Sequence, residues 1–385
     1  MTPPKEETRA DVCRWVALSS VYGVGSVLFK RLMLRFGAAG AVFGAPEHEL
    51  GRVEGVRPDT VRAIKAFTGW DEAEEELVRA RDAGAEIVTM ADPRYPPNLK
   101  EVHDPPPYLY VKGTLLTEDR ISVAMVGSRM ASEYGRRMTR NMSGELAARG
   151  ITIVSGGARG IDTEAHRGAL GAGGRTIVVL GCGIDVAYPA ENRALFEEAA
   201  ASGAVVTEYP VGTQPAPENF PARNRIISGV SLGVVVMEAA EDSGSLITAT
   251  YSLEQGREVY ALPGSVSSPT SRGTNSLIKK GAKLVDGASD ILLDLFPYMK
   301  GYLGELRLDG QASDGAGGEA LPRPEPNLGP DEKALYEHLT IEPMHVDVVS
   351  EKAGMPVGKA LSLLLGMELR GLIRQLSGMR YVREN

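Results

Sequence analysis

Six short apolar runs alternate with amphipathic helical stretches in the middle of the chain. The runs cover residues 121–127, 151–156, 175–181, 204–209, 232–238 and 258–264. This rhythm predicts an α/β domain built on a parallel, doubly wound sheet. The nearly continuous apolar character of each run indicates strands that are covered on both faces. Ligands of such sheets bind at the carboxyl ends of the strands, and the proline-rich segment 91–113 is expected to wrap one edge.

Short amphipathic helices are expected before this domain, from residue 10 to about residue 70. An apolar-x-Gly-apolar-Gly pattern precedes a helix at Val21 to Gly25, and a weaker copy at Val53 to Arg57 has arginine in place of the second glycine. The pattern resembles the helix-hairpin-helix module, in which the glycine turn donates amides to a nucleic acid phosphate. The alternative is a small packing domain whose glycines end helices.

A glycine- and proline-rich stretch separates the central domain from a small C-terminal one. Residues 301–330 hold seven glycines and four prolines, which predicts a linker. After it come three helical patterns and a hairpin turned at Gly378, the order of a winged helix. Seven basic and eight acidic residues from 331 to 385 leave a net charge of −1, which favours a protein-interaction role over a phosphate-binding one. The predicted domains are therefore 1–75, 76–300, a linker over 301–330, and 331–385.

Composition narrows the class of protein further. The 385 residues are 43% hydrophobic and 24% charged, as in a soluble globular protein. Cys13 and Cys182 lack metal-ligand spacing, so neither a disulfide framework nor a zinc site is expected. The N-terminal residues lack the order of a signal peptide, and no apolar run is long enough to span a bilayer. We expect a cytoplasmic protein with no membrane insertion.

Charge points to a local anion site. The net charge is −8, but eight arginines and four acids between residues 121 and 180 give that segment +4. Three loops at predicted strand ends combine glycine, small polar residues and arginine. Their candidate residues are Gly127, Ser128 and Arg129 in the first loop, Ser155, Gly156, Gly157 and Arg159 in the second, and Phe220, Arg223, Asn224 and Arg225 in the third.

These loops fit a nucleic acid strand better than a mononucleotide. Neither the G-x-G-x-x-G nor the G-x-x-x-x-G-K-[ST] pattern occurs in the chain. Parallel strands place such loops about 5 Å apart on one rim, so anions can be held at successive positions. Phe220 offers a flat face for stacking an unpaired base, or it anchors its loop to the sheet.

Other polar residues could support chemistry instead. Asp162 and His166 share one helical face, either as a proton-transfer pair or as a capping acid and a structural histidine. Glu208 and Glu238 end strands at the same rim and are the acid/base candidates for a hydrolase. Because no nucleophile accompanies Asp162 and His166, we expect no catalytic residue. The absence of both standard phosphate-binding patterns and of metal-ligand spacing predicts no cofactor and no metal.

Six motifs in order resemble the DprA/Smf family of DNA-processing proteins. They are "MVGSR", "SGGARGID" with "AH", "GCGID" with "YP" and "EN", "FPARNRIISG", "SGSLITA", and "GREVYALPG" with "GTNSLIKKGA". The resemblance covers Ser122 to about Asp294 strongly. It implies an extended Rossmann-like domain between a helix-hairpin-helix or SAM-like domain and a winged helix. It also implies a homodimer that binds and protects single-stranded DNA and loads RecA onto it in natural transformation of competent cells.

The resemblance also assigns roles to residues. It implies that Gly127, Ser128, Arg129 and the segment Arg223, Asn224 and Arg225 contact the DNA backbone, and that Phe220 meets a base. Lysines common in relatives are Ala190 and Pro217 here, so arginines such as Arg159 or Arg193 are expected to compensate. Two alternatives are a Rossmann-like nucleotide-processing hydrolase and a winged-helix DNA-binding regulator.

Overall fold

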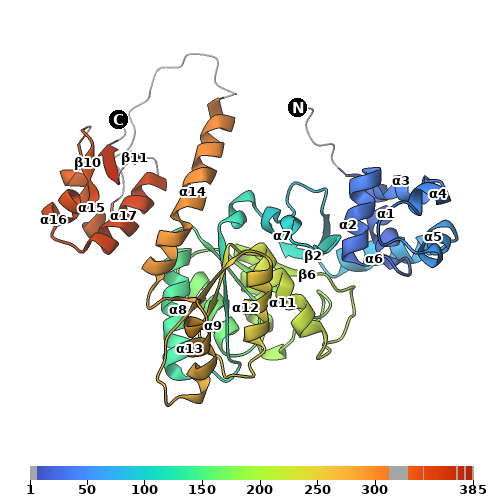
Figure 1. Ribbon diagram of the computed structural model, residues 1–385, viewed down its shortest axis with the longest axis horizontal. Helices are drawn as coiled ribbons and strands as arrows, with labels where there is room; N and C mark the ends of the chain where they lie inside the picture. The colour runs from blue at the N-terminus through green and yellow to red at the C-terminus, as the bar shows by residue number, and fades with distance from the viewer. Residues whose placement is uncertain (1–6, 312–327, 341, 370–371, 377–378, 384–385) are drawn as a thin grey trace. The chain divides into compact units, whose positions relative to one another are not determined.

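The structure is a computed structural model that describes residues 7–311, 328–340, 342–369, 372–376 and 379–383. Its backbone forms two compact units, Met1–Asp286 and Gly287–Asn385 (Figure 1). The predicted limit at residue 75 does not separate compact units, because the N-terminal helices share a hydrophobic core with the sheet that follows. Within the described residues, no helix has both the length and the apolar character needed to cross a membrane.

The first unit begins with the expected helices. They are α1 (Arg9–Ser20), α2 (Ser26–Phe36), α3 (Ala39–Gly44), α4 (Glu47–Leu50), α5 (Pro58–Lys65) and α6 (Trp70–Asp82). Glycine turns join α1 to α2 and α4 to α5, as the two hairpin patterns predict. Gly23 has φ of 84°, and a Cβ on it would lie 2.5 Å from Thr60 Oγ1 of α5. The first turn therefore needs glycine both for its conformation and for its close approach to α5.

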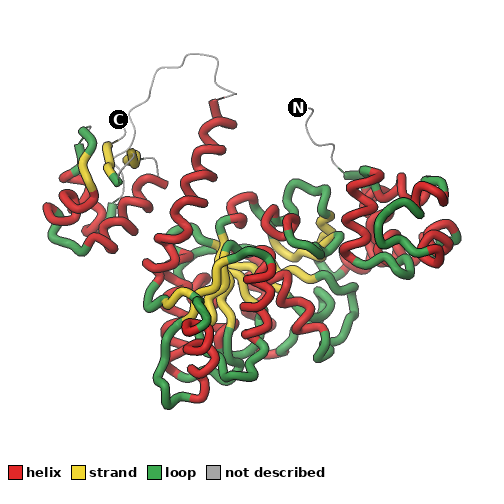
Figure 2. The backbone as a smooth tube through the Cα atoms, viewed as in Figure 1, coloured by secondary structure: helices red, strands yellow, loops and turns green. Residues whose placement is uncertain are grey.

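A mixed nine-stranded sheet, in the order β1-β2-β6-β5-β4-β3-β7-β8-β9, forms the centre of the first unit (Figure 2). The six predicted strands are all present, as β3 (Ser122–Val126), β4 (Thr152–Ser155), β5 (Thr176–Val179), β6 (Ala204–Thr207), β7 (Gly233–Val236) and β8 (Glu258–Ala261). They are parallel to one another. The remaining strands are β1 (Glu86–Thr89), β2 (Tyr108–Gly113) and β9 (Lys283–Leu284). Segment 91–113 extends the sheet and does not wrap its edge, because its end is β2, which lies between β1 and β6 and pairs antiparallel with both.

Helices cover the sheet, and the strand order creates a crevice. The helices are α7 (Pro97–Glu101), α8 (Glu133–Ala147), α9 (Ile161–Gly171), α10 (Arg193–Ser202), α11 (Asn219–Val230), α12 (Ser245–Glu254) and α13 (Arg272–Lys279), with short 3-10 turns η1 (Thr117–Arg120), η2 (Ala190–Asn192) and η3 (Pro269–Ser271). From β3 the chain builds β4, β5 and β6 on one side and then returns to β7 on the other. This reversal is a topological switch point, where open α/β sheets bind their ligands.

One prediction about this region is wrong. The segment "NFPARNRIISG" is helix α11 and not a loop, so Phe220, Arg223, Asn224 and Arg225 project from a helix. Pro221 lies in the first turn of α11, where its missing N–H costs no helical hydrogen bond. Its presence was therefore no argument against a helix.

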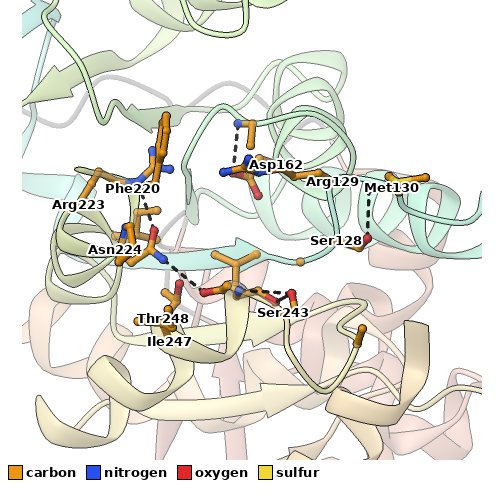
Figure 3. A pocket seen from close by; sticks show the side chains of 18 of the residues that line it. Ser128, Arg129, Met130, Asp162, Phe220, Arg223, Asn224, Ser243, Ile247 and Thr248 are labelled. Atoms are coloured by element: carbon orange, nitrogen blue, oxygen red, sulfur yellow. Dashed lines mark hydrogen bonds between the residues drawn. The ribbon is translucent and has the colours of Figure 1, made fainter. Parts of the chain in front are cut away.

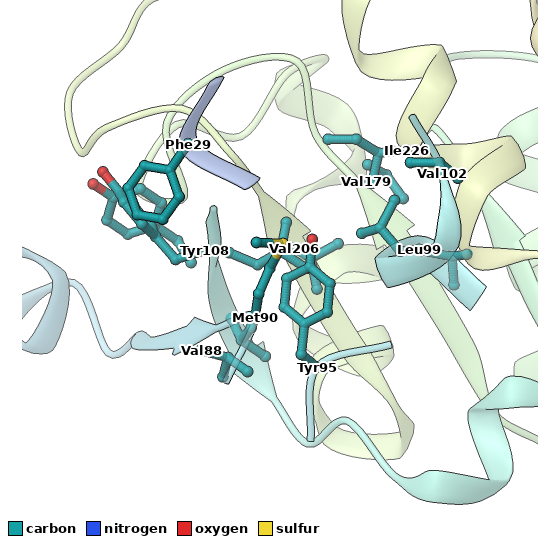
Figure 4. Packing of buried hydrophobic residues seen from close by; sticks show 14 of the residues in the cluster. Phe29, Val88, Met90, Tyr95, Leu99, Val102, Tyr108, Val179, Val206 and Ile226 are labelled. Atoms are coloured by element: carbon teal, nitrogen blue, oxygen red, sulfur yellow. The ribbon is translucent and has the colours of Figure 1, made fainter. Parts of the chain in front are cut away.

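The hydrophobic core of the first unit is continuous from the N-terminal helices to the sheet. Trp15 of α1 and Phe29 of α2 stack with ring centroids 5.0 Å apart. Phe29 belongs to the same buried cluster as Tyr108 of β2 and Val206 of β6 (Figure 4). The sheet is thereby held from both the helical N-terminal region and its own covering helices.

The second unit contains the winged-helix elements. They are α15 (Pro330–His338), β10 (Met344–His345), α16 (Val346–Lys352), α17 (Val357–Leu369), β11 (Ile373–Leu376) and β12 (Arg380–Arg383), and they follow α14 (Ala288–Gln311). Strands β11 and β12 pair antiparallel, and Gly378 between them lies outside the described residues.

The predicted linker needs a correction. Residues 301–311 continue helix α14, because leucine, glutamate and arginine in "YLGELRLDGQ" favour a helix over the two glycines of that stretch. Residues 312–327 of the predicted linker lie outside the described residues.

Candidate nucleic-acid interface

The loop after β3 lies at the switch point and is fixed on both sides. The Ser128 N–H donates to Glu238 O after β7 at 2.8 Å, and the Ile161 N–H at the start of α9 donates to Ser128 O at 3.2 Å. Gly160 has φ of 75°, and a Cβ on it would lie 2.3 Å from Ser128 O. The first and second predicted loops therefore touch, as expected from their strand ends, and only glycine fits between them.

Most of the second loop is buried, so it supports the rim and contributes little to its surface. Ser155, Gly156 and Gly157 are all buried. Ser155 Oγ donates to Met125 O at 2.6 Å, which ties β4 to β3. Arg159 is the exposed member of this loop, with 67% of its side chain accessible, and it forms an ion pair with Glu191.

Arg223 lies inside the molecule and not on the rim. It is 4% exposed, and its guanidinium donates to Gly156 O at 2.6 Å and to Val179 O. Asp162 faces it and accepts a hydrogen bond from the Ala158 N–H at 3.2 Å. Burial raises the pKa of Asp162, and the charge of Arg223 opposes this rise. Burial lowers the pKa of Arg223, and the charge of Asp162 opposes that change. The two groups therefore form a buried pair beneath the rim.

Arg225 is also engaged with protein. It is 9% exposed, and its Nη2 lies 2.5 Å from Glu208 Oε2 while its Nε lies 3.2 Å from Asp104 Oδ2. Burial raises the pKa of Glu208, and Arg225 opposes this rise. Neither arginine of the Arg-Asn-Arg segment thus presents a free guanidinium to a ligand.

An aromatic and cationic cluster lies at the rim, with Arg129 and Tyr188 exposed and Phe220 partly buried. The ring centroids of Tyr188 and Phe220 are 5.5 Å apart with an interplanar angle of 30°. The guanidinium carbon of Arg129 lies 5.4 Å from the centroid of Phe220, in cation–π range. Phe220 and Tyr188 are therefore placed to accept a planar group once the Arg129 guanidinium, which lies over the Phe220 ring, moves aside.

These residues border a groove of about 610 Å³ (Figure 3). Phe220 and Asn224 approach it from α11, and Ser243, Ile247 and Thr248 approach it from α12 and the loop before that helix. Arg129 and Met130 lie across from α11, and Met130 is 85% exposed. The groove has the volume of a small-molecule site and opens at the carboxyl ends of β3, β4 and β7.

Tyr188 and Ser243 were not among the predicted site residues. The motif "GCGIDVAYP", which contains Tyr188, follows a predicted strand at the same rim. Ser243 belongs to the motif "EDSGSLITA", which also follows a predicted strand, and it lines the groove. Strand-end position was the available signal in both cases.

The candidates for acid/base chemistry do not offer free groups to the groove. His166 is fully buried, its Nδ1 lies 2.7 Å from Thr176 Oγ1, and burial lowers its pKa to about 3. Glu238 is 3% exposed and accepts hydrogen bonds from the backbone N–H and the hydroxyl of Ser132 at 2.7 and 2.5 Å. Among the described residues, no cluster of three or more potential ligands could hold a metal ion.

Comparison with known proteins agrees with this architecture. The family model of DNA recombination-mediator protein A matches residues 86–296, which is more than half of the chain. The chain belongs to this family. A model of the DprA winged helix domain matches residues 319–379. Among family members, the chain is 37% identical to Protein Smf of Synechocystis, over 96% of this chain and 98% of that protein.

Solved structures of the family show the same fold. The X-ray structure of DNA processing protein A from Streptococcus pneumoniae has a TM-score of 0.63 and 34% identity, and the match covers 73% of this chain and 97% of that one. The Helicobacter pylori family member has a TM-score of 0.50 and 30% identity, with 56% of this chain and 98% of that one covered. That structure concerns the binding of single-stranded DNA by the Helicobacter protein.

Proposed function

We propose that this protein binds single-stranded DNA along the rim at the switch point of its sheet. The observation that carries the proposal is the cluster of exposed Arg129 and Tyr188 with partly buried Phe220, beside a groove of about 610 Å³. Aromatic side chains next to cations are what a strand with unpaired bases requires, because bases stack and phosphates need positive charge. A duplex keeps its bases paired and away from Phe220, so single strands are preferred.

The residues of the rim then divide into two groups. Arg129 and Arg159 are exposed and act on phosphates, with Gly127 and Ser128 shaping the loop that carries Arg129. Ser155, Gly156, Gly157, Arg223 and Arg225 act from below as positioning residues, because their side chains or backbones are buried in protein contacts. Arg193 is exposed at the start of α10 and is a further candidate for a phosphate contact.

Family membership extends the proposal to a biological role. We propose that a cytoplasmic homodimer of this chain receives and protects incoming single-stranded DNA in natural transformation and loads RecA onto it. Sedimentation at twice the 41.1 kDa of the chain would support the dimer. Faster assembly of RecA on a labelled single strand in the presence of this protein would support the loading role, and an unchanged rate would refute it.

The binding site itself is tested by the salt dependence of affinity. Fluorescence anisotropy of a labelled single-stranded oligonucleotide is measured across a salt series for wild type, Arg129→Ala and Arg149→Ala. Loss of one phosphate contact lowers the salt slope by about 0.7 for a single strand. We expect this change for Arg129→Ala only, because Arg149 lies before β4, at the amino ends of the strands. Equal slopes for all three proteins, or equal affinity for blunt duplex, would contradict the proposal.

A further inference from the structure

The interior of the groove suits an uncharged part of a DNA strand better than a phosphate. Arg129 is the exposed cation of its lining, whereas Asp162 and Arg223 are both buried and offset each other. A phosphate pushed inside would approach the Asp162 carboxylate, and the Arg223 guanidinium is already occupied by two backbone carbonyls. The phosphates of a bound strand therefore belong at the mouth, near Arg129, and a neutral base belongs inside.

Phe220 and Asn224 lie on one face of α11 because they are four residues apart. Four residues advance a helix by about 6 Å, so the amide of Asn224 follows the aromatic ring along the groove wall. Figure 3 shows both side chains on the same side of the groove, with the Asn224 amide directed at the backbone of Gly244, the residue after Ser243. A base stacked on Phe220 thus turns its polar edge toward the Asn224 amide.

The amide of Asn224 is held in a defined orientation but keeps hydrogen-bonding capacity. Its Oδ1 accepts from Arg223 Nε at 3.3 Å, and its Nδ2 lies 3.5 Å from Gly244 O, too far for a strong bond. One carbonyl lone pair and the amide hydrogens remain for a ligand. The Ser243 hydroxyl, 2.8 Å from Ser245 Oγ, adds a second group that can donate or accept.

We propose that this wall, formed by Asn224 and Ser243, reads the hydrogen-bonding edge of one unpaired base while Phe220 stacks on its face. The inference rests on the proposed single-stranded DNA binding and gives Asn224 a base-edge role in place of the backbone contact implied by the family resemblance. An amide that offers one donor and one acceptor side by side can pair with the N3–H and O4 of thymine.

The test compares oligo(dT) with the same oligomer built from N3-methylthymine. Both have the same charge and stacking face, and a homopolymer places the same base in the groove in every register. Methylation removes the donor that Asn224 Oδ1 would accept. Wild type should bind oligo(dT) about three- to tenfold more tightly, which corresponds to the loss of one or two hydrogen bonds. Asn224→Leu, which cannot pair with either edge, should reduce the ratio to about one.

Controls separate this inference from the proposed function. Phe220→Leu should weaken binding of both oligomers by similar factors and preserve their ratio, because it removes stacking only. Failure of wild type to bind oligo(dT) would refute the proposed function. If wild type binds oligo(dT) less than about twofold more tightly than the N3-methylthymine oligomer, or if Asn224→Leu keeps the wild-type ratio, the base-reading wall is overturned and the proposed function stands.

A second variant covers the case in which Asn224→Leu does not fold. That substitution leaves Arg223 Nε without its acceptor in a buried setting. Ser243→Ala leaves Arg223 untouched, since the Ser243 hydroxyl contacts Ser245. If Asn224→Leu is unfolded, the affinity of Ser243→Ala for oligo(dT) decides: weaker binding than wild type supports the proposal, and unchanged binding overturns it.

Discussion

Replacing Arg223 by methionine should destabilise the first unit, not merely weaken DNA binding. The substitution keeps most of the side-chain volume but leaves the Asp162 carboxylate buried without its cation, and it leaves Gly156 O and Val179 O without their donor. Removal of one partner from a buried ion pair typically costs about 3–5 kcal/mol. At roughly 2–4 °C per kcal/mol for a large domain, the melting temperature should fall by about 6–20 °C.

The loss of stability should depend on pH in a defined direction. Burial already raises the pKa of Asp162 above its ordinary value of 3.8, and loss of the Arg223 charge raises it further. A carboxyl with a higher pKa in the folded state than in the unfolded state loses stability as the pH rises from the unfolded pKa through the folded one. Arg223→Met should therefore be less damaging at pH 5 than at pH 8, where the folded carboxyl must lose its proton.

Thermal unfolding followed by tryptophan fluorescence measures this effect, because Trp15 and Trp70, the two tryptophans of the chain, both belong to the first unit. Asp162→Asn combined with Arg223→Met removes both charges and should recover part of the lost stability at pH 8. Arg129→Met is the exposed control and should change the free energy of unfolding by less than about 0.5 kcal/mol. An Arg223→Met protein that melts like wild type but fails to bind DNA would show that Arg223 is a direct ligand contact.

Three further outcomes are expected. Phe220→Leu should weaken single-strand binding by about 1–3 kcal/mol without changing the salt slope, because stacking carries no charge; a loss that disappears at high salt would contradict this. Glu191→Gln should tighten binding modestly at low salt, since it frees Arg159 from its ion pair, and titration at high salt should show no difference. Deletion of residues 331–385 should leave the affinity for single strands nearly intact. The segment carries a net charge of −1, and Lys359 of α17 is paired with Asp331 at 2.7 Å. Complete loss of binding in anisotropy would instead favour a winged-helix regulator.

The sheet was predictable because each buried parallel strand is a short run of consecutive apolar residues, whereas an amphipathic helix repeats its apolar residues every three to four positions. The edge strands were harder: β1 is four residues long and half exposed, and β9 has two exposed residues, so neither leaves an apolar pattern. Helix α11 was missed because proline, arginine and asparagine in "FPARNR" are typical of a loop, and only its docking on the sheet and α12 shows that the segment is helical.

The candidate site was predictable in position but not in the roles of its arginines. Arg129 and Phe220, predicted on one rim, do lie together, although Arg129 is on the loop after β3 and Phe220 is on helix α11. Sequence alone gives every arginine the same charge, whereas burial decides whether that charge reaches solvent. Arg223 and Arg225 face inward from α11 toward Asp162 and Glu208, acids that are distant in the sequence and adjacent only in the fold.

The contact between Arg129 and Phe220 has a consequence for how firmly a strand can be held. In the free protein the guanidinium covers the ring at 5.4 Å, so each group already has a partner. In the proposed complex a phosphate takes the guanidinium and a base takes the ring, and the cation–π contact is given up. Binding at this point is an exchange of partners, and when the strand leaves the two side chains satisfy each other again. Such a site lowers the barrier to release, which suits the proposed transfer of the strand to RecA.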